Sequence, residues 1–162
     1  MNSARPPTPA GLRRARRAIS TLRRLRGRVL WGASVNRAAD WLKQAELDLL
    51  GAEASAAVGR HEWTAFQAQQ SATKAVEALI QALHGAVRGH AITEMLRQLP
   101  ERVEVPTALL EGAQELDKVY VTSRYPNGFA SGTPSDYFNA RSSRELLGYA
   151  RAILAWCRSQ IH

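Results

Sequence analysis

The sequence lacks the features of several special structural classes. Its 162 residues include one cysteine, Cys157, which excludes an intrachain disulfide framework and a zinc site built from several cysteines. No apolar run approaches the roughly 18 residues that a membrane-spanning helix needs. Hydrophobic residues still make up 45% of the chain, which argues against wholesale disorder. We therefore expect a soluble, cytoplasmic protein with one globular domain.

Acidic residues are missing from the start of the chain, where Asp40 is the first of them. Residues 1–30 contain nine arginines, whereas the rest of the chain carries 13 basic and 14 acidic residues. The net charge of +8 is therefore a property of the N-terminal segment and not of the body. We divide the chain into a basic arm, residues 1–34, and a helical body, residues 35–162.

Three interpretations of the arm remain open. Its apolar residues recur at three- and four-residue steps between Leu12 and Val29, which is typical of an amphipathic helix on an anionic membrane or along phosphates. An arginine-rich, acid-free segment is also typical of a targeting peptide. The third interpretation is that translation starts at Val35, directly before the helical periodicity of the body begins, and that the arm is not made.

Periodic apolar residues predict five helices in the body, and no convincing alternating pattern predicts a strand. Asn36 is expected to cap the first helix, while Gly59 and Gly85 end the first and the second. Pro106 is expected to be the first residue of the fourth helix, which ends before Pro126. The expected fold is an all-α, five-helix, up-down antiparallel bundle with helices over residues 36–58, 62–84, 91–98, from 106 to before 126, and 137–160.

The second helix has an unusually polar sequence. Gln70 falls within its apolar stripe, where a buried glutamine that forms interhelical hydrogen bonds is the simpler interpretation and a ligand contact is the alternative. His90, at the start of the third helix, has a similar pair of interpretations: its ring caps backbone amides or faces a cleft. The buried stripe of the second helix is expected to comprise Trp63, Phe66, Gln70, Thr73, Val76, Ile80 and Leu83.

Arg124 and Tyr125 form the strongest candidate site. Pro126 forces Tyr125 out of helical geometry, which places Arg124 in the last turn of the fourth helix, beside a Gly/Pro-rich loop over residues 125–136. There, Arg124 can bond to the terminal carbonyls and interact with the helix dipole. It can equally clamp a phosphate while Tyr125 stacks on a base. The local chemistry leaves both roles open.

Other kinds of site have no matching pattern in the sequence. His61, His84 and His90 are too scattered to predict a zinc site, and we expect neither a metal nor a cofactor. No glycine-rich phosphate loop or nucleophile elbow occurs. Cys157 falls on the predicted buried stripe of the last helix, so a reactive thiol is not expected. That stripe is expected to comprise Leu146, Ala150, Ile153, Leu154, Cys157 and Ile161.

Six short segments between residues 36 and 160 occur in a characteristic order. Together they resemble the HEPN domain, a helical domain that binds nucleotides. They are Ala39-Asp40-Trp41-Leu42 with Ala45 to Leu49, Phe66 to Ala75, Gly89-His90-Ala91-Ile92, Leu116-Asp117 to Tyr120, Ser123-Arg124-Tyr125-Pro126, and Tyr137 followed by the last helix.

The resemblance implies a five-helix bundle that commonly dimerises. Many prokaryotic members are encoded with a small nucleotidyltransferase in a two-gene, toxin–antitoxin-like module. The partners expected here are accordingly a second copy of the chain, a nucleotidyltransferase subunit, or both, with nucleotide or RNA as the ligand. The nucleotide-binding residues that the resemblance implies are Arg124, Tyr125, His90, Gln70, Lys74, Tyr120, Asp117 and Tyr137.

Other members of the family are metal-independent ribonucleases that use an arginine followed, after four to six residues, by a histidine. No arginine in this chain has a histidine at that spacing; Arg158 and His162 are separated by three residues. The sequence instead resembles the Arg-Tyr-Pro type, for which nucleotide or partner binding is the expected function. A ribonuclease with Arg124 and His90 brought together in space is the alternative, and a ligand-free dimerisation module is a third hypothesis.

Overall fold

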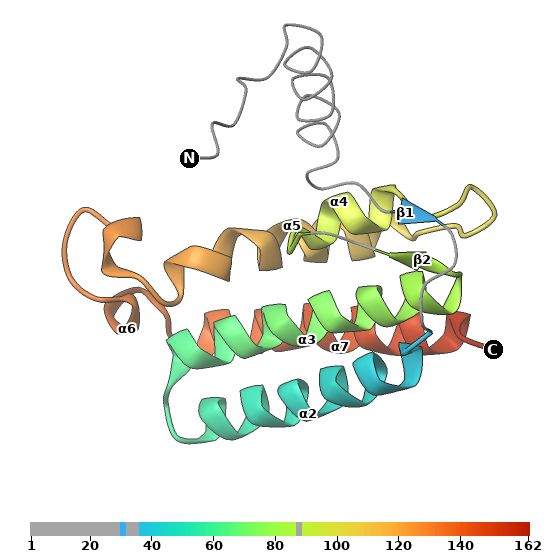
Figure 1. Ribbon diagram of the computed structural model, residues 1–162. Coiled ribbons are helices and arrows are strands. Elements are labelled where there is room, and N and C mark those ends of the chain that lie inside the picture. The colour runs from blue at the N-terminus through green and yellow to red at the C-terminus, as the bar shows by residue number, and fades with distance from the viewer. Residues whose placement is uncertain (1–29, 32–35, 87–88) are drawn as a thin grey trace, which may run out of the picture.

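The computed structural model describes residues 30–31, 36–86 and 89–162, most of which are helical (Figure 1). The arm predicted over residues 1–34 lies outside the described residues, apart from the two at positions 30 and 31. In chain order the elements are β1 (Leu30–Trp31), α2 (Ala38–Ala57), α3 (His61–Ala82), β2 (Gly85–Ala86), α4 (Ile92–Arg97), α5 (Thr107–Thr122), the 3₁₀ turn η1 (Pro126–Gly128), α6 (Pro134–Tyr137) and α7 (Ala140–Gln160).

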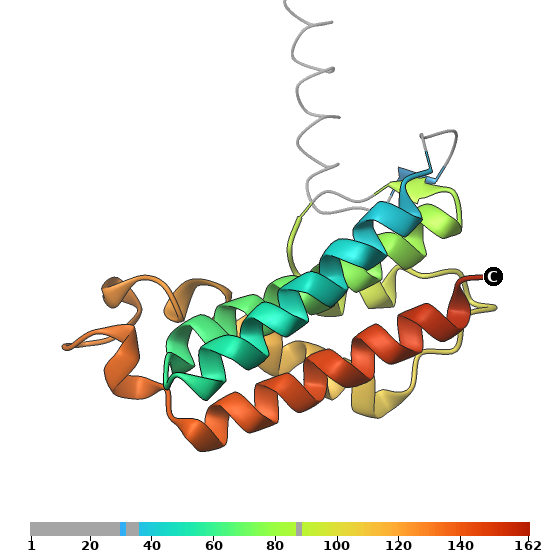
Figure 2. The ribbon, with the colours of Figure 1, turned by 90° about the horizontal axis from the view of Figure 1, so that it is seen from below.

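Helix α3 is the centre of the bundle. It packs against α2, α7, α5 and α4, and 14 of its 22 residues are buried (Figures 1 and 2). Small side chains such as Ala68, Ala72 and Ala75 are fully buried and let the neighbouring helices approach from several sides. The single buried stripe predicted for this helix therefore covers too little of its buried surface. Trp63, which is predicted to lie in that stripe, is 43% exposed.

Helices α2 and α3 form an antiparallel hairpin, in agreement with the up-down topology predicted for the bundle (Figure 1). Gly59 adopts a φ of 75°, a left-handed conformation that glycine takes without strain. The Arg60 amide donates to the Ser55 carbonyl, and the Gly59 amide donates to Ala56, which is the pattern of a Schellman motif. The prediction that Gly59 follows the end of the first helix is confirmed.

Several predicted helix ends differ from those observed by one to three residues. Asn36 does not occupy the capping position of α2, which is Arg37, although its side-chain oxygen accepts from the Ala38 amide. His84, not Gly85, takes the left-handed conformation after α3, with a φ of 61°. Pro106 precedes the first residue of α5 instead of being that residue. Helix α7 begins at Ala140 because the Asn139 side chain accepts from the amides of the first turn.

The segment expected as a loop over residues 125–136 is only partly irregular. It contains η1 and the one-turn helix α6, whose first turn is fixed by a capping box between Thr133 and Asp136. The prediction of no strand also needs a correction. Two residues of β1 pair with two residues of β2 in an antiparallel ladder, which is too short to leave an alternating pattern in the sequence.

One hydrophobic core runs through the body, and the all-α bundle is confirmed, with the single turn α6 added to the five expected helices. The predicted stripe of the last helix is buried from Leu146 to Cys157, while Ile161 is partly buried. None of the helices in the described residues is long and apolar enough to cross a membrane. The largest fully buried apolar side chains are Leu79, Ile80, Ile92, Leu96, Leu116 and Ile153.

Candidate functional site

Arg124 lies two residues beyond Thr122, the last residue of α5, and so just past the last turn in which the sequence predicts it. Its Nε donates a hydrogen bond to the Tyr120 carbonyl at 3.1 Å, so the expected contact with the carbonyls at the end of this helix is confirmed. Tyr125 has extended backbone angles, φ −120° and ψ 126°, as expected for a residue that precedes proline. Among the described residues, no carboxylate forms an ion pair with Arg124.

Three aromatic rings surround the Arg124 guanidinium. Its central carbon lies 4.5 Å from the ring centre of Phe66, 4.7 Å from that of Tyr120 and 5.0 Å from that of Tyr125. These distances fall within the range of cation–π contacts. Tyr125 is 51% exposed, which leaves part of its surface open to a ligand. The three rings hold a charged, planar donor in one place, which is the arrangement that suits recognition of a phosphate.

His90 joins the same cluster through Tyr120. The two rings stack with their centres 5.1 Å apart and their planes at 23°. Asp117 positions this region, since its two carboxylate oxygens accept from the Ile92 and Thr93 amides at 2.8 and 3.0 Å, at the start of α4. Asp117 therefore fixes the segment that carries His90, and both of its oxygens already have protein partners.

A chain of hydrogen bonds leads from His90 across α3 to α2. The His90 carbonyl accepts from Gln69 Nε2 at 3.2 Å, and Gln69 Oε1 accepts from Gln70 at 2.8 Å. Gln70 Oε1 in turn accepts from Lys74 at 3.2 Å, and Lys74 forms an ion pair with Asp48. The fully buried glutamine is Gln69, whereas Gln70 is partly exposed, so the expectation of a buried Gln70 is displaced by one residue.

The structure brings most of the predicted site residues together. Arg124, Tyr125, Tyr120 and His90 contact one another directly or through one ring, and Gln70 and Lys74 follow through the hydrogen-bond chain. Tyr137 is in a different contact group: it stacks on Phe129 with ring centres 3.8 Å apart and donates to the Ser131 carbonyl.

Two residues at this site are not among the ligand candidates that the sequence provides. Phe66 is assigned to the core by its spacing, but its ring is the closest of the three to the Arg124 guanidinium. Gln69 falls outside the predicted apolar stripe. Both residues lie in or next to an unusually polar segment of the sequence, from Gln67 to Lys74. A helix that only packs against apolar neighbours does not need so many polar side chains, so this segment is the sequence signal that could have identified Phe66 and Gln69 as site residues.

A hollow of about 280 Å³ opens beside Arg124, between the start of α3 and the loop that carries α6. Trp63 forms one wall, while the Glu62 carboxylate is already bound to Arg60 at 2.8 Å. The volume is near the lower end of the roughly 300–1,000 Å³ typical of small-molecule sites. Its lining residues are Glu62, Trp63, Ser123, Arg124, Thr133, Pro134 and Ser135.

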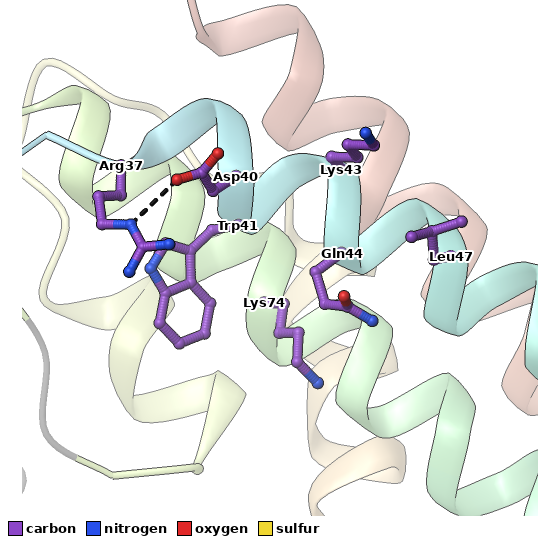
Figure 3. A pocket seen from close by; sticks show the side chains of 7 residues that line it. All are labelled: Arg37, Asp40, Trp41, Lys43, Gln44, Leu47 and Lys74. Atoms are coloured by element: carbon purple, nitrogen blue, oxygen red, sulfur yellow. Dashed lines mark hydrogen bonds and ion pairs between the residues drawn. The ribbon is translucent and has the colours of Figure 1, made fainter.

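A second hollow, of about 460 Å³, lies between α2 and α3 (Figure 3). We call it the Trp41 groove. The Trp41 indole, the Arg37 guanidinium and the Lys74 side chain point to the same side in Figure 3, and Arg37 is bound to Asp40 at 3.0 Å. Its lining residues are Arg37, Asp40, Trp41, Lys43, Gln44, Leu47 and Lys74.

Metal and thiol chemistry have little support in the described part of the chain. No group of three His, Cys, Asp or Glu side chains there could hold a metal ion. Cys157 is fully buried, and burial raises the pKa of its thiol well above the ordinary value. A thiol that stays protonated at physiological pH is a poor nucleophile, as the sequence predicts for this residue.

Comparisons with known proteins agree with this architecture. A family model described as HEPN domain matches residues 38–160. Among solved structures, a protein from Thermus thermophilus is 38% identical with a TM-score of 0.76, and the match covers 78% of this chain and 99% of that one. An archaeal HEPN homologue is 38% identical with a TM-score of 0.68, over 79% of this chain and 100% of that one.

A HEPN domain protein from Thermotoga maritima is 30% identical with a TM-score of 0.61, over 74% of this chain and 95% of that one. No curated protein matches the chain. The matched span includes the Arg124 cluster, the hydrogen-bond chain across α3 and all of the helices from α2 to α7. The chain therefore belongs to the HEPN domain family.

Proposed function

We propose that this HEPN-domain protein is a nucleotide-binding subunit that acts with a small nucleotidyltransferase in a toxin–antitoxin-like module. The observation that carries the nucleotide part is the Arg124 guanidinium, which is held by three aromatic rings and has no carboxylate partner among the described residues. A fixed, planar cation recognises phosphate, and the exposed face of Tyr125 offers a stacking surface for a base.

The test of nucleotide binding is a titration with fluorescently labelled nucleoside mono- and triphosphates, read by fluorescence anisotropy. Arg124→Ala is expected to weaken binding about tenfold or more, because a hydrogen bond to a charged group contributes about 1.5–3 kcal/mol. Arg144→Ala is the matched control, since Arg144 is an exposed arginine on α7. If the unchanged protein binds no nucleotide, or if both variants bind equally well, the proposed role of Arg124 is wrong.

The partner is tested separately from the nucleotide. The full chain carries an affinity tag, is expressed from its own locus, and is purified for intact-mass spectrometry. A nucleotidyltransferase chain is expected to co-purify in a stable complex. Recovery of a homodimer alone contradicts the partner part of the proposal and leaves the nucleotide titration as an independent result.

A second candidate function is metal-independent cleavage of RNA. The observation that favours it is that His90 and Arg124 both lie against the Tyr120 ring, although no histidine follows an arginine at the spacing of the family's ribonucleases. In such an enzyme, a histidine transfers the proton and an arginine stabilises the charged transition state. The local spacing is missing, but in the fold both residue types lie against one ring, that of Tyr120.

RNA incubated with the protein and a chelator distinguishes the two candidates. Cleavage that is lost in both Arg124→Ala and His90→Ala, and kept in the control His162→Ala, would establish the ribonuclease. Intact RNA with the unchanged protein removes that candidate. If the protein neither binds nucleotide nor cleaves RNA, and Arg124→Ala lowers only its stability, the ligand-free dimerisation module is the remaining hypothesis.

A further inference from the structure

Helix α3 is buried almost all round, but one strip of it reaches the surface. Trp63, Phe66, Gln70 and Lys74 are exposed or partly exposed, while the residues that alternate with them are mostly buried. Their spacing of three and four residues places them on one face of the helix. We call these four residues the α3 strip. Gln67, also partly exposed, accepts from Ser55 of α2 and so belongs to the hairpin contact.

The α3 strip lies between the hollow beside Arg124 and the Trp41 groove. At one end, Phe66 contacts Arg124 and Trp63 lines the hollow beside it. At the other end, Lys74 lines the Trp41 groove. Phe66 and Lys74 are eight residues apart, which corresponds to about 12 Å along a helix axis. Gln70 lies between them, and its amide, which already bonds to Gln69 and Lys74, keeps a second N–H and a second lone pair for the edge of a base.

The Trp41 groove has the chemistry of a subsite for a base and a phosphate. The partly buried Trp41 indole supplies a flat ring, and Gln44 an amide. Lys43 is exposed and no ion pair or hydrogen bond holds it within the described residues. The other two cations have carboxylate partners that a phosphate must compete with. These pairs are Arg37 with Asp40 and Lys74 with Asp48.

We propose that the Trp41 groove is a second binding subsite, which takes a base and a phosphate of a single-stranded oligonucleotide whose other end lies on the Arg124 cluster. This inference rests on the proposed nucleotide-binding function. The two hollows share no lining residue, but the α3 strip lies between them and supplies the Gln70 amide and the Lys74 ammonium. Aromatic rings at two sites with a cation and an amide between them are an arrangement that binds single strands with little dependence on sequence. A mononucleotide would occupy one end only, so the ligand that uses both ends must be longer.

The experiment measures the affinity of the full chain for a labelled mononucleotide and for labelled oligouridylates of two, four and eight residues. Affinity is expected to rise with length until both ends are occupied. Trp41→Leu is expected to weaken binding of the longest oligonucleotide by about fivefold to a hundredfold, the range for loss of one stacked base. It leaves mononucleotide binding unchanged, whereas Arg124→Ala weakens both.

Lys43→Ala is the second variant, because Lys43 is exposed and its loss does not disturb packing. It is expected to reduce the slope of log affinity against log salt by about 0.7, as for one phosphate contact on a single strand. Lys118→Ala, which removes an exposed lysine from α5, is the matched control and leaves the slope unchanged.

The two proposals fail in different ways. If affinity does not depend on length, and Trp41→Leu and Lys43→Ala bind the longest oligonucleotide as the unchanged protein does, the groove is not a subsite, while an effect of Arg124→Ala keeps the proposed function. If Trp41→Leu abolishes oligonucleotide binding and Arg124→Ala has no effect, the proposed function of Arg124 is wrong and the joint site with it. If no oligonucleotide and no mononucleotide binds, both are overturned.

Discussion

The Arg124 side chain owes its fixed position to contacts from three directions. One nitrogen is bound to the Tyr120 carbonyl, and the guanidinium lies against rings from α3, α5 and the following loop. A side chain held in this way has few rotamers to lose when it binds an anion, so more of the interaction energy appears as affinity. Lysine has neither the flat face nor the Nε donor and would not be held there in the same way.

Glu77 gives the stability of the protein a dependence on pH. It is 9% exposed on α3, and burial raises the pKa of its carboxyl, while the hydrogen bond from Gln81 opposes part of that shift. The folded state therefore holds the proton more tightly than the unfolded chain does. Ionised Glu77 lowers the free energy of unfolding above its folded-state pKa, and this cost disappears as the pH falls below the ordinary value of 4.5.

Glu77→Gln is accordingly expected to raise the melting temperature at pH 8 and to change it much less at pH 4. Glutamine keeps the size of the side chain and can still bond to Gln81. Glu111→Gln, an exposed change on α5, is the control and shifts neither melting temperature. Thermal unfolding followed by circular dichroism at both pH values checks the prediction; an equal effect at pH 8 and pH 4 would contradict it.

Helices α5 and α7 meet at a glycine. A side-chain carbon added at Gly112 would lie 3.0–3.2 Å from three atoms of Tyr149, including its Cβ, which cannot swing away as the end of a flexible side chain can. Gly148, on α7 itself, has nothing within 4 Å of that position. Alanine is generally the better helix former, and Gly148 has room for its methyl group. At Gly112 the same methyl group would press against Tyr149.

Gly148→Ala is expected to stabilise the protein by about 0.5–1 kcal/mol, because alanine loses less backbone entropy in a helix. Gly112→Ala is expected to destabilise it by about 1–3 kcal/mol, since α5 and α7 must move apart. Urea unfolding of both variants measures the difference. If Gly112→Ala stabilises the protein, Tyr149 can move aside at little cost and the predicted clash is wrong.

The helices differ in how well their sequences predict which of their residues are buried. Helix α7 has one apolar face, and the stripe predicted from Leu146 to Cys157 is buried. Helix α3 packs on several sides, so its period of apolar residues is blurred by buried Thr, Ser and Gln side chains, and the assignment of Trp63 to the core is wrong. Periodicity locates a helix with one buried face but cannot describe one that is surrounded.

At the scale of the whole molecule, the apolar core and not the surface charges holds the bundle together. Two ion pairs connect α7 to α2, Arg151 with Glu53 and Arg158 with Glu46, and all four side chains are more than a third exposed. Exposed pairs of this kind contribute about 0–1 kcal/mol each. Leu79, by contrast, is fully buried in α3 at the centre of the core.

Glu53→Gln is expected to change the free energy of unfolding by less than about 1 kcal/mol, and less at high salt. Leu79→Ala is expected to lower it by about 2–5 kcal/mol, through lost burial and the cavity that remains. Chemical denaturation of the two variants at low and high salt tests this ranking. If Glu53→Gln lowers the free energy of unfolding more than Leu79→Ala does, the surface charges and not the apolar core hold the bundle together.

The fold could be predicted because glycine and proline separate five amphipathic segments of helical length. The resemblance of six short segments to the HEPN domain then indicates how these helices are arranged in a bundle. The Arg124 site could be predicted in part, since the proline after Tyr125 indicates where the helix ends. The Phe66 contact could not, because it joins α3 to a residue 58 positions later. The Trp41 groove likewise depends on how α2 is set against α3, which no local pattern records.

The last residues of the chain lie beside the first turn of α2. Ile161 and His162 line one hollow together with Asn36, Ala38 and neighbouring residues, and Figure 1 shows the C-terminus at that end of the bundle. A short peptide could therefore join position 162 to position 36, and the polypeptide could be opened in the turn between α4 and α5 instead. Such a circular permutant would keep the packing of α2, α3 and α7 intact while it alters the order in which they emerge during synthesis.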